Sequence, residues 1–67
     1  MNNDWVGVFT TPYEHKAEIA KAILNENEIN SVIINRKDSA YLFGELEVYV
    51  NGDDVLRAKL ILERGNI

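Results

Sequence analysis

The sequence predicts a single α+β domain whose elements follow the order strand, helix, strand, strand, helix (β-α-β-β-α). Two segments show the apolar spacing of an amphipathic helix, and three short runs are rich in the β-branched and aromatic residues that strands favour. At 67 residues the chain has room for one domain, residues 1–67, because such a fold needs most of that length for its core. Its 46% apolar and 27% charged residues are typical of globular proteins.

The first strand is predicted over residues 5–10, where the run WVGVFT is followed by a Thr-Pro pair that ends it. Successive side chains of a strand point to opposite faces of the sheet. Trp5, Gly7 and Phe9 are therefore expected on one face. Val6 and Val8 are expected on the other.

The first helix is predicted to start at Thr11, where three helix-start signals coincide. Thr11 is the expected N-cap, Pro12 occupies the first helical position, and Glu14 can return a hydrogen bond to the cap. The helix is expected to stop between Asn25 and Asn27, because Asn tolerates the left-handed conformation of a C-cap. The residues predicted on its core side are Tyr13, Ala17, Ala20, Ile23 and Leu24.

Two further strands follow, joined by a connection over residues 36–44 that shows no clear period. The run SVIIN at residues 31–35 has the length and branching of a strand, but its successive apolar residues leave its inward face open. The run ELEVYV at residues 45–50 alternates strictly, which places Leu46, Val48 and Val50 on the core face.

The second helix is predicted over residues 53–64, with Asn51 as its N-cap and Gly65 as its stop. Leu56 and Leu60 lie on nearly the opposite side from the apolar stripe, where a small domain normally carries charge. The stripe itself comprises Val55, Ala58, Ile61 and Leu62.

These elements assemble most simply as a ferredoxin-like β-α-β-β-α domain that lacks the last strand. A right-handed crossover joins the first two strands, and the third lies between them, which gives an antiparallel sheet of order 2-3-1. Both helices then cover one face of the sheet. The other face is left uncovered, and the first strand becomes an unprotected edge.

The charge balance argues against nucleic acid and anionic membranes as partners. Seven Lys and Arg residues stand against eleven Asp and Glu, a formal net charge of −4, and Arg36-Lys37 is the main basic pair. No basic and apolar leader and no apolar run of about 18 residues is present, so a cytoplasmic location is expected. The chain contains no Cys and therefore no disulfide.

A spaced pattern of residues runs along nearly the whole chain: Trp5…Val8, Pro12…Ala17…Ile19…Lys21…Leu24, Ile29, Asp38-Ser39…Phe43-Gly44-Glu45, Glu47-Val48-Tyr49-Val50 and Asp54…Ala58…Ile61-Leu62. This pattern resembles a bacterial domain-of-unknown-function family labelled "putative prokaryotic signal-transducing protein". The resemblance implies a signalling role. It also implies that the chain is a small relative of PII-type signalling proteins, which share the ferredoxin-like core and carry an effector-responsive loop between strands two and three.

The chain departs from that family at the end of the first helix. Where the family commonly has Gly-Ile, this chain has Glu28-Ile29, so the cap is expected at Asn27. The nucleotide sites of PII proteins are not carried over, because the chain has no Gly-rich phosphate loop and no Lys/Arg clamp.

Trp5, Phe9 and Tyr49 form the first candidate site, an aromatic cluster around Gly7 on the uncovered face. Clustered exposed aromatics indicate a binding surface, and Gly7 is expected to leave a shallow depression. The equally weighted alternative is that the connection 36–44 folds over this face and covers the aromatics with Tyr41, Leu42 and Phe43. Leu56 and Leu60 extend the candidate interaction surface onto the second helix.

The connection is the second candidate site. Its polar residues could hold a small anion or a partner's carboxylate, although a solvated turn explains them as well. They are Arg36, Lys37, Asp38, Ser39 and Tyr41.

The remaining titratable residues give little support for catalysis. His15 is the only imidazole and lies in the first turn of the predicted helix, where a solvated His is the simpler interpretation. Glu45 and Glu47 share one strand face at a separation that a metal or an acid/base pair could use, but strand alternation alone explains them. We expect no enzyme activity, no metal and no cofactor.

The sequence therefore predicts a non-catalytic regulatory or protein-interaction module that forms a homodimer through the open sheet face or the edge of the first strand. The alternative is a sensor in which Arg36 and Lys37 hold an anionic effector and the connection orders around it. A metal-assisted enzyme built on Glu45, Glu47 and His15 is the most remote possibility.

Overall fold

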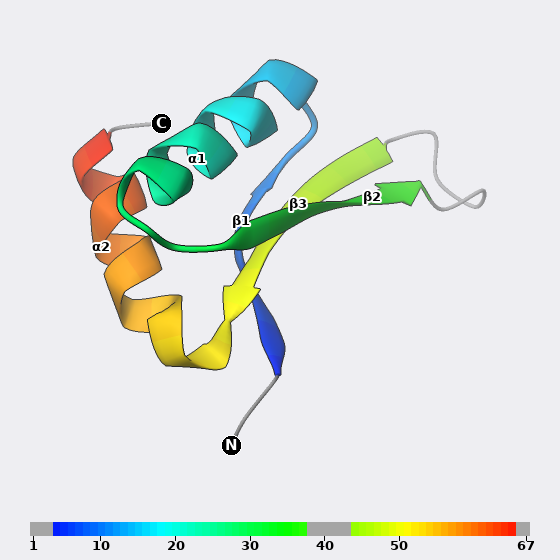
Figure 1. Cartoon of the computed structure of the whole chain (residues 1–67). Coiled ribbons are helices and arrows are strands. Elements are labelled where there is room, and N and C mark those ends of the chain that lie inside the picture. The colour runs from blue at the N-terminus through cyan, green and yellow to red at the C-terminus, as the bar shows by residue number, and fades with distance from the viewer. Residues whose placement is uncertain (1–3, 38–43, 66–67) are drawn as a thin grey trace.

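The computed structural model describes residues 4–37 and 44–65 and has the predicted order of elements (Figure 1). The elements are β1 (Trp5–Thr11), α1 (Glu14–Glu26), β2 (Ser31–Lys37), β3 (Gly44–Asn51), the 3₁₀ turn η1 (Gly52–Asp54) and α2 (Val55–Gly65). Within the described chain, neither helix is long and apolar enough to cross a membrane.

The sheet has three strands in the order β1-β3-β2, which confirms the predicted order 2-3-1 and the α+β class. Both neighbouring pairs are antiparallel. The two helices lie together on one face of this sheet, as Figure 1 shows. The other face carries no described helix.

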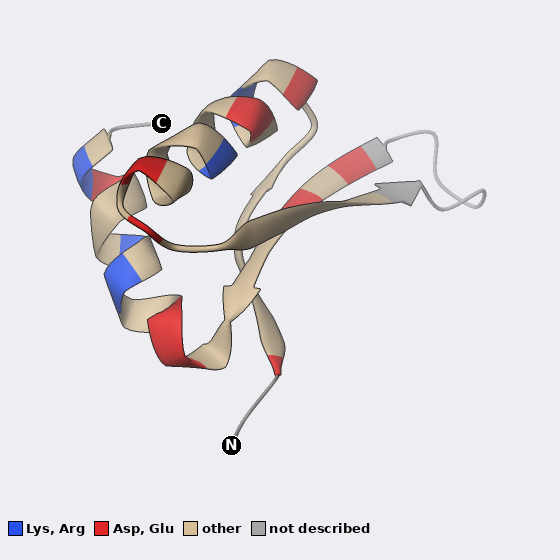
Figure 2. Ribbon diagram, viewed as in Figure 1, with Lys and Arg blue, Asp and Glu red and all other residues tan. Residues whose placement is uncertain are grey.

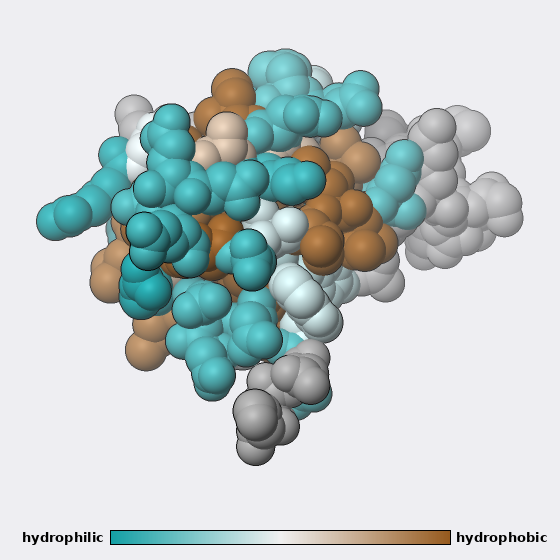
Figure 3. All heavy atoms as spheres, viewed as in Figure 1, coloured by the Kyte–Doolittle hydropathy of each residue, from teal (hydrophilic) through white to brown (hydrophobic). Residues whose placement is uncertain are grey.

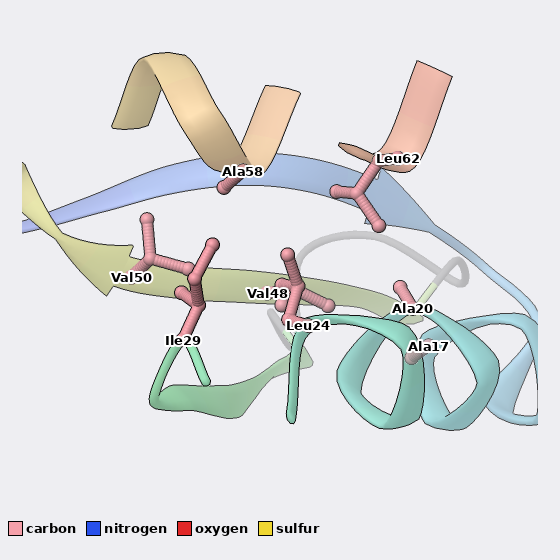
Figure 4. Close-up of a cluster of buried hydrophobic side chains, with 8 residues drawn as sticks. All are labelled: Ala17, Ala20, Leu24, Ile29, Val48, Val50, Ala58 and Leu62. Carbon is pink, nitrogen blue, oxygen red and sulfur yellow. The ribbon is translucent and has the colours of Figure 1, made fainter. Parts of the chain in front are cut away.

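The core lies between the sheet and the two helices (Figure 4). Most predicted core positions of both helices and of β3 are buried or pack against the buried cluster. Two predicted positions lie outside this cluster: Ile23 is half-buried, and Tyr13 is exposed at the start of α1 beside Lys16, whose Nζ is 5.5 Å from the centre of the Tyr13 ring. The buried cluster comprises Ala17, Ala20, Leu24, Ile29, Val48, Val50, Ala58 and Leu62.

Helix α1 begins later than the sequence predicts. Thr11 is the last residue of β1, where it is buried and pairs with Leu46. The N-cap is Tyr13, whose side chain makes no capping hydrogen bond and whose carbonyl accepts the first helical bonds. The Thr11 hydroxyl still binds the backbone at this turn: Thr11 Oγ1 accepts a hydrogen bond of 3.1 Å from the Tyr13 N–H.

Helix α1 ends where predicted, but the left-handed residue is Glu28 and not an Asn. Asn27 is the C-cap with φ −101°, whereas Glu28 has φ 62°. The Glu28 N–H donates to the Asn25 carbonyl at 3.0 Å and the Ile29 N–H donates to the Leu24 carbonyl at 2.9 Å. This is the Schellman motif, in which the apolar residues Leu24 and Ile29 also pack together in the core.

Strand β1 contains a β-bulge that the sequence analysis did not foresee. Gly7 pairs with Tyr49 and Phe9 with Val48, so Val8 is an extra residue that opposes no residue of β3. The strict alternation predicted for β1 therefore fails after Gly7. Phe9 packs against the buried cluster, on the helix-covered face, and the prediction that it faces outward is wrong.

The start of the second helical segment agrees with the predicted cap. Asn51 Oδ1 accepts a hydrogen bond of 3.1 Å from the Asp53 N–H, but the first turn is 3₁₀ and α2 proper starts at Val55. Gly65 is the last residue of α2 and not the residue after it.

Candidate interaction surface

The uncovered face of the sheet is defined by the strand register. Val48 and Val50 of β3 are fully buried under the helices, so the alternate residues Glu47 and Tyr49 point to the uncovered face. Their neighbours across the sheet share that face. These neighbours are Gly7 and Thr10 on β1 and Val32 and Ile34 on β2, with Trp5 two residues before Gly7.

Three apolar side chains are exposed on this face. Trp5 is 47% exposed, Ile34 44% and Val32 38%, and the half-buried Tyr49 lies between the two outer strands. Figure 3 shows an apolar area at the surface over β2, beside the hydrophilic atoms of the helices. We call Trp5, Val32, Ile34 and Tyr49 the open-face patch.

Val32 and Ile34 are members of the patch that the sequence analysis missed. Their run of successive apolar residues carries no alternation, so the sequence alone could not orient it. The pairing of β2 with β3 settles the orientation, because Ile33 lies opposite the buried Val48. The expected pairing with β3, whose residues alternate strictly, is the signal from which the outward orientation of Val32 and Ile34 could have been predicted.

The space above Gly7 is occupied and is not a depression. A Cβ added at Gly7 would lie 2.5 Å from Glu47 Oε2, so the Glu47 side chain crosses the bare backbone at this point. The Tyr49 hydroxyl donates a hydrogen bond of 3.1 Å to Glu47 Oε1. Glu47 and Tyr49 thus form a half-buried polar pair in the middle of the face, and the predicted hollow between Trp5 and Phe9 is wrong.

Leu56 and Leu60 are exposed, as predicted, but they do not extend the open-face patch. Their exposed fractions are 79% and 61%. They lie on α2, which packs against the opposite face of the sheet from Trp5. Figure 3 shows a separate apolar area over α2.

Only two of the polar candidates of the connection belong to the described part of the chain. Arg36 and Lys37 belong to β2 and not to a loop, whereas Asp38, Ser39 and Tyr41 lie outside the described residues. The proposed cover by Tyr41, Leu42 and Phe43 also falls there. The anionic-effector sensor stays a prediction.

His15 and the carboxylates of β3 do not come together. His15 is exposed, and its ring centre lies 5.9 Å from that of Tyr13. Glu45 is exposed on β3. In residues 4–37 and 44–65 no group of three or more His, Cys, Asp or Glu side chains could hold a metal ion.

The fold and this surface define a class: a two-layer α+β domain with helices on one sheet face and an apolar patch on the other. The chain belongs to the family described as "putative prokaryotic signal transducing protein", whose family model matches residues 5–66. A search of curated proteins and a search of solved structures each found no match. The family description thus points to a role in signal transduction.

Proposed function

We propose that this chain is a non-catalytic regulatory module that acts in signal transduction by binding protein, and that it associates with a second copy of itself. The observation that carries the proposal is the open-face patch on the side of the sheet that no described helix covers. Monomeric proteins rarely leave large contiguous apolar patches in water, and such patches mark binding surfaces. The family description supports the signalling part of the proposal.

The composition of the patch fits recognition of protein. Trp and Tyr are enriched at the centres of protein interfaces, because they bury a large apolar area and keep a polar atom for hydrogen bonding. In this chain the Tyr49 hydroxyl already has its partner in Glu47, so Tyr49 can be buried without losing that bond. Glu45 and Glu47 also place negative charge on this face, which disfavours the phosphates of a nucleic acid.

Dilution tests self-association, and Trp5 is a convenient probe because it is the only Trp in the chain. Light scattering should give a mass above the 7.6 kDa of a single chain at high concentration and 7.6 kDa on dilution. Over the same range, a shift of the Trp5 emission to longer wavelength would show that the joint covers the indole, whereas constant emission with a falling mass would place the joint away from Trp5.

Leu56→Lys is the matched control, because it changes an exposed apolar residue away from the patch and should leave the dilution curve unchanged. A mass of 7.6 kDa at every concentration, with constant emission, would contradict self-association. The protein-binding role would then have to be tested by capture of a different protein on wild-type chain and its loss on Trp5→Lys.

A further inference from the structure

The two edges of the sheet differ in how well they could accept another strand. β1 carries the bulge at Val8 and is followed directly by Pro12. Bulges and prolines are the devices by which proteins block pairing at sheet edges. β2 has neither: its seven residues pair with β3 in one unbroken register. Within the described chain only β3 pairs with β2, so its outer side has no strand beside it.

We propose that β2 pairs antiparallel with β2 of a second copy, so that two three-stranded sheets join into one continuous sheet across a two-fold axis. This inference rests on the proposed function, and it names the partner and the edge that self-association uses. It also replaces the β1 edge that the sequence suggested. A two-fold interface requires a surface that complements itself, and an edge strand that pairs antiparallel with its own copy meets that requirement.

The apolar residues of β2 select one register. With Ile33 on the two-fold axis, Val32 of one copy lies opposite Ile34 of the other, and the reverse pair forms on the far side of the axis. All four side chains share the uncovered face, where each is partly exposed in a single copy. Opposed apolar pairs stabilise a sheet, and a shift by one residue would move these side chains to mismatched faces.

The two ends of β2 differ in the charge of their sequence. The exposed Glu26 and Glu28 precede the strand, whereas its last two residues are Arg36 and Lys37. Figure 2 shows the acidic residues on the chain that leads into β2. In the Ile33-centred register, Arg36 and Lys37 of each copy lie opposite Asn30 and Ile29 of the other, directly after its acidic lead-in. The two symmetric Val32–Ile34 pairs favour a second copy over an unrelated strand, because each copy supplies both halves of the match.

Single lysine substitutions distinguish edge pairing from stacking of two open faces. Ile34→Lys should raise the dimer dissociation constant at least about tenfold, because it destroys both symmetric Val32–Ile34 pairs. Thr10→Lys is the matched control, since Thr10 is exposed on the same face but on the opposite edge strand. Trp5→Lys should likewise leave the dissociation constant within about twofold, because β1 lies two strands from the joint. Circular dichroism of each variant checks that the chain is folded.

A mixed dimer tests the register directly. Ile34→Lys and Val32→Glu should each weaken the homodimer, yet an equimolar mixture should recover most of the wild-type affinity. In that mixture the Lys at 34 of one chain faces the Glu at 32 of the other, and the unaltered Val32 and Ile34 face each other. Sedimentation velocity on the mixture and on each variant alone gives the three dissociation constants.

The outcomes separate this inference from the proposed function. If Trp5→Lys weakens the dimer as much as Ile34→Lys, and mixing recovers nothing, the two copies stack face to face. Edge pairing is then wrong, while self-association stands. If the wild-type chain is monomeric at every concentration, the edge pairing and the self-association both fail. Loss of dimer only in the β2 variants, with recovery on mixing, establishes the edge pairing.

Discussion

At the scale of single residues, the end of α1 depends on a backbone conformation that its residue does not favour. Glu28 holds φ 62°, a left-handed conformation in which a side chain crowds its own backbone. Glu28→Gly should therefore raise the free energy of unfolding by about 1 kcal/mol, seen as a higher urea midpoint. Asn27→Gly is the control: Asn27 has φ −101° and its side chain binds the Ile23 carbonyl, so this change should destabilise. Equal effects at both positions would contradict the prediction.

Removal of two buried hydroxyls at the ends of strands should change the free energy of unfolding in opposite directions. The Ser31 hydroxyl is buried at the start of β2 with no hydrogen-bond partner among residues 4–37 and 44–65, whereas the Thr11 hydroxyl accepts from the Tyr13 N–H. A buried polar group without a partner lowers stability, and a satisfied one raises it. Ser31→Ala should stabilise the domain by about 1 kcal/mol and Thr11→Ala should destabilise it by about the same amount. Urea denaturation measures both, and a loss of stability in Ser31→Ala would show that its hydroxyl is satisfied in solution.

At the scale of elements, the sequence pattern located the α-helices and strands of the described chain but not the orientation of each strand face. β3 alternates strictly, so its core residues could be predicted, and both helices carry clear apolar stripes. The faces of β1 could not be predicted, because the bulge at Val8 adds one residue and so moves Phe9 from the open face to the core. Trp5 and Tyr49 were placed correctly because they lie outside the shifted segment. Tertiary pairing, and not local sequence, fixes these positions.

The outer side of α2 gives a test of the helical phase. Leu56 and Leu60 are exposed, whereas Leu62 is buried in the core on the same helix. Changing both exposed leucines to Lys should alter the free energy of unfolding by less than about 0.5 kcal/mol. Leu62→Ala should lower it by about 2–5 kcal/mol, because it leaves a cavity. Thermal and urea unfolding compare the two variants; unfolding of the double lysine variant would contradict the placement of these leucines.

At the scale of the whole molecule, the short chain has a small core, and its helices leave one apolar face of the sheet uncovered. Three of the eight buried core residues are alanines, which bury little apolar area. The described helices cover one sheet face (Figure 1), so Trp5, Val32 and Ile34 on the other face stay partly exposed in an isolated chain. Association with a second copy stabilises such a domain by mass action, because only the folded state binds. Under the proposed self-association, the stability of the domain therefore depends on the joint between the two copies.

This coupling predicts that thermal stability depends on protein concentration. Unfolding enthalpies average about 0.7 kcal/mol per residue, so a dimer of two such chains that dissociates as it unfolds should gain about 10 °C in Tm for a hundredfold rise in concentration. Calorimetry from about 10 μM to about 1 mM covers that range. The Ile34→Lys variant should show a much smaller dependence, and Thr10→Lys should follow the wild-type curve, since only the first substitution lies at the proposed joint. A wild-type Tm that is independent of concentration would mean that folding and association are not linked, because the Tm of any dimer that dissociates on unfolding must rise with protein concentration.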